Sequence, residues 1–61
     1  MYVVMLFLNF EGYQIDDHNR VFKHEKNANK YCDKLNEKFY GSANPESDEY
    51  YDVIYFDRGN G

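Results

Sequence analysis

Few residues of the chain are of the types that perform covalent or metal chemistry. The single cysteine is Cys32, and the two histidines are His18 and His24. Zinc sites draw their ligands from closely spaced pairs of Cys and His, and these three residues form no such pair. A nucleophilic cysteine needs an exposed, electropositive setting and a neighbouring base, whereas Cys32 belongs to an apolar helical stripe. The sequence therefore predicts no enzyme, no cofactor and no metal site.

The length of the chain limits how it achieves stability. Its 61 residues predict one domain, residues 1–61. A domain of this size buries only about 60% of the surface that its unfolded chain exposes. A lone cysteine forms no internal disulfide, so self-association is the remaining support and a homodimer is expected.

The first ten residues are apolar, but they resemble neither a signal peptide nor a membrane span. No basic flank precedes the run, no small-residue cleavage site follows it, and ten residues are too few to cross a bilayer. A lone cysteine suits a reducing compartment. We therefore expect a cytoplasmic protein with no membrane contact.

Three segments have the composition of strands. Residues 2–8 form a continuous apolar run rich in β-forming residues, which predicts a strand buried on both faces. Turn-forming residues follow at 9–12. Residues 13–22 predict a second strand, with a bulge or widened turn at the polar positions 16–19. Residues 50–56 predict the third strand.

One amphipathic helix separates the second strand from the third. From Glu25 onward, apolar residues recur at steps of three and four: Ala28, Tyr31, Cys32, Leu35 and Phe39. Lys23 and His24 stand where a capping Ser, Thr, Asp or Asn is usual, so the start of the helix is poorly capped. Gly41 is placed to end it in a left-handed conformation.

This order predicts an α+β fold, β-β-α-β, with the helix packed on one face of a three-stranded sheet. The crossover through the helix makes the second and third strands parallel. Placing both beside the first strand gives an antiparallel sheet of order 2-1-3. Its central strand is then the most apolar one, as burial requires.

One helix covers only one face of such a sheet, yet the first and third strands are apolar on both faces. An uncovered apolar face usually marks an interface. Within it we predict four partner-binding residues: Phe7, Tyr51, Val53 and Tyr55. The alternative is that Phe10, Tyr40 and the 42–49 loop fold over this face.

Charge is unevenly distributed along a chain whose net charge is −4. Residues 18–38 carry six basic and three acidic residues, and both flanking segments are acidic. Four lysines at steps of four form a helical ridge that could meet an anionic partner: Lys26, Lys30, Lys34 and Lys38. A solvated helix face explains the same pattern. The sequence pI of about 4.9 disfavours nucleic acid as that partner.

The segment between the helix and the third strand, together with the start of that strand, is acidic. We predict that its carboxylates contact a partner: Glu46, Asp48, Glu49 and Asp52. Carboxylates in such a cluster could imitate DNA phosphates and enter a basic groove on an enzyme, with electrostatic steering of the encounter. A plain solvated loop is the alternative.

Several short segments together resemble very small β-β-α-β proteins that are common among phage and prophage genes. They are Gly12-Tyr13-Gln14-Ile15, Val21-Phe22, Glu25-Lys26-Asn27-Ala28, Tyr31, Leu35-Asn36 and Tyr50-Tyr51-Asp52-Val53, after an apolar first strand. The resemblance covers nearly the whole chain. The sequence departs from it at the helix cap, where Lys23 and His24 replace the usual Ser, and at residues 16–19.

The resemblance implies a non-enzymatic viral protein that binds and inhibits a bacterial host protein. The expected targets are defence factors, including restriction and CRISPR components, or transcription and replication machinery. No site residue carries over from the resemblance. The alternatives are a nucleic-acid-associated or regulatory module that uses the lysine ridge, and a DNA mimic that uses the acidic segment.

Overall fold

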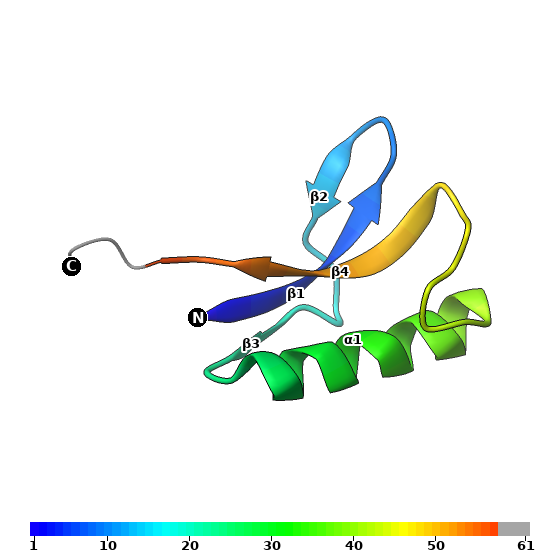
Figure 1. Cartoon of the computed structure of the whole chain (residues 1–61). Helices are drawn as coiled ribbons and strands as arrows, with labels where there is room; N and C mark the ends of the chain where they lie inside the picture. Colours follow the sequence, from blue (N-terminus) through cyan, green and yellow to red (C-terminus); the bar gives the residue numbers. More distant parts are fainter. Residues whose placement is uncertain (58–61) are drawn as a thin grey trace.

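The computed structural model describes residues 1–57 and consists of one helix packed beneath one sheet (Figure 1). The elements, in chain order, are β1 (Tyr2–Leu8), β2 (Gly12–Gln14), β3 (Arg20–Phe22), α1 (Glu25–Tyr40) and β4 (Glu49–Tyr55). β1 is the central strand. It pairs antiparallel with β2 and β3 along one side and with β4 along the other.

This arrangement confirms the predicted α+β class and the placement of the first strand at the centre. The predicted second strand is divided into β2 and β3, which pair with the two ends of β1. The interruption covers residues 15–19, so it includes Ile15 in addition to the polar positions. β4 is the predicted third strand, on the far side of β1.

The turn between β1 and β2 requires a glycine. The Glu11 amide donates to the Leu8 carbonyl at 3.1 Å, and Gly12 then pairs with Leu8 at φ 82°. A side chain at φ near +80° is strained, so glycine is the residue that this bulged hairpin turn favours.

Two polar residues fasten the interruption between β2 and β3 to the rest of the domain. Asn19 donates from Nδ2 to the Val4 carbonyl at 3.0 Å, and its Oδ1 accepts the Asp16 amide at 2.6 Å. Asp16 in turn accepts the hydroxyl of Tyr51 at 2.6 Å. The polar positions therefore attach the interruption to β1 and β4 through side chains instead of a backbone ladder.

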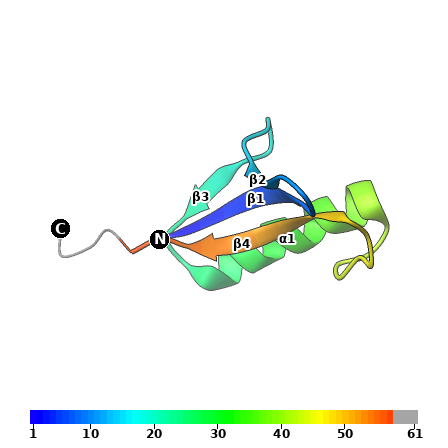
Figure 2. The same ribbon diagram turned by 90° about the horizontal axis from the view of Figure 1, so that it is seen from above.

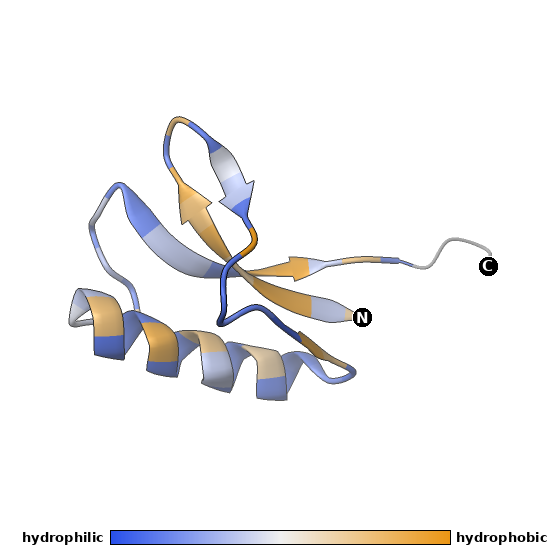
Figure 3. Cartoon of the chain, turned by 180° about the vertical axis from the view of Figure 1, so that it is seen from behind, coloured by the Kyte–Doolittle hydropathy of each residue, from blue (hydrophilic) through white to orange (hydrophobic). Residues whose placement is uncertain are grey.

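The helix begins and ends as the sequence predicts. His24, at the N-cap, makes no side-chain capping bond. Gly41 adopts φ 80° and donates its amide to the Glu37 carbonyl at 3.1 Å, which closes the last turn. In Figure 3 the apolar stripe of the helix faces the sheet and the polar side faces away.

The core lies between α1 and the sheet and is small. Five apolar residues are buried there: Val4, Ala28, Cys32, Leu35 and Tyr51. Partly buried residues surround them, among which Tyr2, Leu6 and Val53 come from the helix-facing side of the sheet. Tyr51 spans this layer, because its backbone lies in β4 while its hydroxyl reaches Asp16 beyond β1.

Candidate functional site

The side of the sheet opposite the helix is built mainly of apolar residues. Paired residues of an antiparallel sheet point to the same face, so the register identifies its members. Val3 pairs with Val21 and Ile54, Met5 with Asp52, and Phe7 with Tyr13 and Tyr50. We call this surface the open face, and its residues are Val3, Met5, Phe7, Tyr13, Val21, Tyr50, Asp52 and Ile54.

Phe7 is the centre of an aromatic cluster on the open face. Its ring centroid lies 5.1 Å from that of Tyr13 and 5.2 Å from that of Tyr50, both tilted. The Tyr13 hydroxyl donates to Asp52 Oδ2 at 2.9 Å across the sheet. Partial burial and this bond to Asp52 raise the pKa of the Tyr13 phenol. The open face therefore combines rigid rings with one carboxylate that already has a partner.

No described segment covers the open face (Figure 2). Phe10 is 93% exposed on the hairpin turn, and Tyr40 packs against the core on the helix side, with its hydroxyl donating to Glu49 Oε1 at 3.2 Å. The expected alternative, in which these residues and the 42–49 loop close over the sheet, is therefore wrong. Tyr13 and Val21 remain 45% and 54% exposed.

The predicted partner-binding residues of β4 do not share a face with Phe7. Tyr51 is 6% exposed in the core, and Val53 packs against that core beneath the sheet. Tyr55 lies on the same side, where its ring meets that of Tyr2 at 5.1 Å. The prediction that side chains of β4 alternate between the two faces is correct, but the three residues that it assigned to the uncovered face point toward the helix.

The four predicted acidic residues do not form one surface either. Glu46 and Asp48 are exposed on the segment before β4, and Glu49 opens the strand on the helix side, where Tyr40 reaches it. Asp52 instead lies on the open face beside Tyr13. Glu49 and Asp52 therefore lie on opposite faces of β4.

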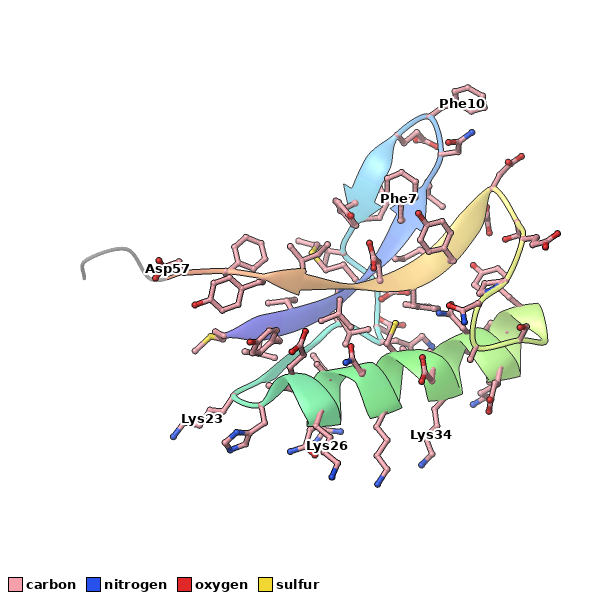
Figure 4. The ribbon with its side chains drawn as sticks, viewed as in Figure 1. Phe7, Phe10, Lys23, Lys26, Lys34 and Asp57 are labelled. Atoms are coloured by element: carbon pink, nitrogen blue, oxygen red, sulfur yellow. The ribbon has the colours of Figure 1, made fainter. Side chains whose placement is uncertain are left out.

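The lysine ridge lies on the outer side of the helix. Figure 4 shows Lys26 and Lys34 pointing away from the sheet. At the β3 side, Lys30 and Lys34 border a groove of about 320 Å³ that Arg20, Phe22 and Tyr31 also line. The Arg20 guanidinium stacks over both rings, 5.5 Å from Phe22 and 5.6 Å from Tyr31. The structure thus adds Arg20 and two aromatic rings to the predicted basic surface.

Two of the three residues suited to covalent or metal chemistry, Cys32 and His18, pack against apolar neighbours. Cys32 is buried, and burial raises the pKa of its thiol to about 11, which disfavours the reactive thiolate. The His18 ring packs 5.0 Å from Phe39 and 6.1 Å from Tyr51. Within residues 1–57, no three side chains of His, Cys, Asp or Glu gather in a way that could hold a metal ion.

Asn36 carries a structural role that the sequence analysis did not assign. It is 3% exposed, accepts the Tyr51 amide at Oδ1 (2.7 Å) and donates from Nδ2 to the Tyr51 carbonyl (3.0 Å). A side-chain amide thus bonds to β4 as a neighbouring strand would. Its position four residues after Cys32, on the same helical stripe, is the signal that could have identified it.

The described helix is too short and too polar to cross a membrane. Comparison of the chain with protein-family models, with curated proteins and with solved structures finds no significant match.

Proposed function

We propose that the chain is a non-enzymatic binding domain that docks on another protein through its open face. The supporting observation is the open face itself, an aromatic surface of a sheet that no described segment covers. Monomeric proteins seldom expose apolar patches of this kind unless they contact a partner. Tyrosine and phenylalanine are enriched at protein interfaces, and tyrosine is among the residues that most often dominate their binding energy.

The chemistry of the open face favours an apolar partner surface. Its one charge, Asp52, accepts hydrogen bonds from the Tyr13 hydroxyl and from the Val53 amide. Burial of Asp52 at an interface therefore leaves both carboxylate oxygens with partners, which reduces the desolvation cost. The phage-type resemblance suggests the class of partner, a bacterial host protein that the domain would inhibit in the host cytoplasm.

A second copy of the chain is the other occupant that these features favour. Self-contact through the open face would bring together no charges except the two Asp52 side chains. The core is small, with five buried apolar residues, so contact with a second copy would add stability that the core alone supplies poorly. Light scattering across a dilution series separates the two occupants, since a self-paired face gives a dimer mass that falls on dilution.

The test compares changes of an apolar residue to lysine on and off the open face. Phe7→Lys and Val21→Lys place a charge on the face, and Phe10→Lys makes the matched change on the exposed turn. With the folded state checked by circular dichroism, we expect the first two to lose a stoichiometric complex that wild type and Phe10→Lys both form with a bacterial protein. Retention of that complex by both open-face variants would rule the proposal out.

The basic groove beside β3 supports a second candidate, a nucleic-acid-associated module. Arg20, Lys30 and Lys34 surround two aromatic rings, the combination on which single-stranded nucleic acids stack. A gel-shift series at low salt tests it with wild type and Arg20→Glu. Binding that weakens with salt and with Arg20→Glu supports this candidate, and no shift at low salt eliminates it.

A further inference from the structure

The outer edge of β4 presents backbone groups that no strand of the described chain pairs with. Phe56 and Met1 exchange two hydrogen bonds, 2.8 Å and 3.2 Å long, and the Asn9 amide donates to the Asp48 carbonyl at 2.9 Å. Bonded and non-bonded positions alternate along an antiparallel pair. The even-numbered residues of β4 therefore bond to β1, and its odd-numbered residues direct their amides and carbonyls outward: Glu49, Tyr51, Val53 and Tyr55.

The first half of this edge is closed by side chains. Ser47 Oγ accepts the Glu49 amide at 3.2 Å and also bonds to the Glu49 carbonyl. Asn36 bonds to both backbone groups of Tyr51. Proteins often protect edge strands in this way against pairing with another chain.

The second half of the edge is not closed in the same way. The Val53 amide donates to Asp52 Oδ1 at 2.9 Å, within its own strand. The Val53 carbonyl and both backbone groups of Tyr55 point outward, and β4 pairs with β1 alone. These groups match the ladder that an added strand would form.

A groove of about 600 Å³ runs between this edge and the helix. It extends from the paired rings of Tyr2 and Tyr55 to the segment 43–45 after the helix. Its helix wall is the stripe Glu25, Asn29 and Asp33, at steps of four. Lys26 and Lys34 point to the far side of α1 (Figure 4), so the charged helix residues that line the groove are the acidic Glu25 and Asp33.

We propose that the edge of β4 from Val53 to Tyr55 binds an extended, basic segment of a partner protein as an added strand. Alternate side chains of that segment enter the groove, where a lysine or arginine meets Glu25 and Asp33. The same carboxylates argue against a second copy as the occupant, because two β4 edges side by side would bring like charges together. Tyr50 and Asp52 of the open face also border the groove, but the outward backbone groups of β4 and the helix carboxylates belong to this site alone.

The test uses the isotope-labelled full chain and a capped hexapeptide of alternating lysine and valine. We expect saturable NMR shifts at the Tyr55 amide and along the Glu25–Asp33 stripe, and none with the matching glutamate–valine peptide. Shifts confined to the open face or the lysine ridge, equal binding of both peptides, or no saturable shift would each overturn the proposal.

Two variants and one control examine the geometry. Tyr55→Pro removes an outward amide and leaves the β1 ladder intact, so peptide affinity should fall at least about tenfold, the equivalent of a lost hydrogen bond at an edge. Asp33→Asn should weaken binding by about two- to fivefold, as one partly screened charge allows, without affecting the fold. Val21→Lys, on the open face, should bind the peptide like wild type.

Each result with the variants decides between the site and its alternatives. Wild-type affinity in folded Tyr55→Pro would show that the edge of β4 does not bind the peptide. Unchanged affinity in Asp33→Asn would show the same for the groove. A dimer that Tyr55→Pro dissociates would mean that the edge pairs with a second copy, which also contradicts the proposal.

Discussion

Replacement of Asn36 with leucine tests whether a side-chain amide completes the sheet. The substitution keeps the approximate size of the buried side chain but removes its bonds to the Tyr51 amide at 2.7 Å and to the Tyr51 carbonyl at 3.0 Å. Because Asn36 is 3% exposed, water has little access to the groups left behind.

The expected cost is large for so small a domain. Two buried backbone groups that lose their partners cost about 1–3 kcal/mol each, which gives about 2–6 kcal/mol in total. A chain of 61 residues has a free energy of unfolding of only about 3–9 kcal/mol. The variant should therefore lose a large part of the stability of the domain.

Urea denaturation followed by circular dichroism measures this cost, with Asn29→Leu as the control. Asn29 is exposed on the same helix, so its change to leucine should alter stability by less than about 0.5 kcal/mol. If Asn36→Leu costs less than about 1 kcal/mol, or no more than the control, Asn36 does not act as a surrogate strand and the reasoning is refuted.

Three further predictions concern Tyr51 and Cys32 in the core and Gly12 in the hairpin turn. Burial and the hydrogen bond to Asp16 raise the pKa of Tyr51, so the folded state keeps a proton that the unfolded state releases. The free energy of unfolding should therefore fall as pH rises above about 10. Tyr51→Phe should be less stable at neutral pH but lose less stability over this pH range, as urea titrations at each pH would measure. At pH 8, Cys32 should react with a disulfide reagent at least about a hundredfold more slowly than in the urea-unfolded chain, since its pKa is raised from 9.0 to about 11. Gly12→Ala should lower the unfolding free energy by about 1 kcal/mol because φ is 82°, whereas an equal stability of the two proteins would show that the turn does not need glycine.

Local patterns in the sequence predicted most of the elements. Apolar residues at steps of three and four from Ala28 onward indicated the helix, and Gly41 indicated its end. The apolar run of residues 2–8 indicated the central strand. Each of these signals depends on neighbouring residues only, which is why the sequence was sufficient.

The sequence did not show which side of β4 faces the helix. Tyr51 and Val53 alternate with Tyr50 and Ile54, and both sets are apolar, so hydrophobicity does not distinguish them. The choice depends on long-range contacts, above all the reach of the Tyr51 hydroxyl to Asp16, 35 positions earlier. Only the folded chain reveals that a tyrosine needs a distant, partly buried acceptor.

The pairing of β1 with β4 also affects the order in which the protein folds during synthesis. Among the described elements, β1 is synthesised first and its long partner β4 last, with Leu8 opposite Glu49 and Tyr2 opposite Tyr55. At about 5–20 residues per second, β1 waits for seconds with only the short β2 and β3 beside it. The most apolar strand of the nascent chain is therefore exposed longest, which makes it the segment that a chaperone would bind first.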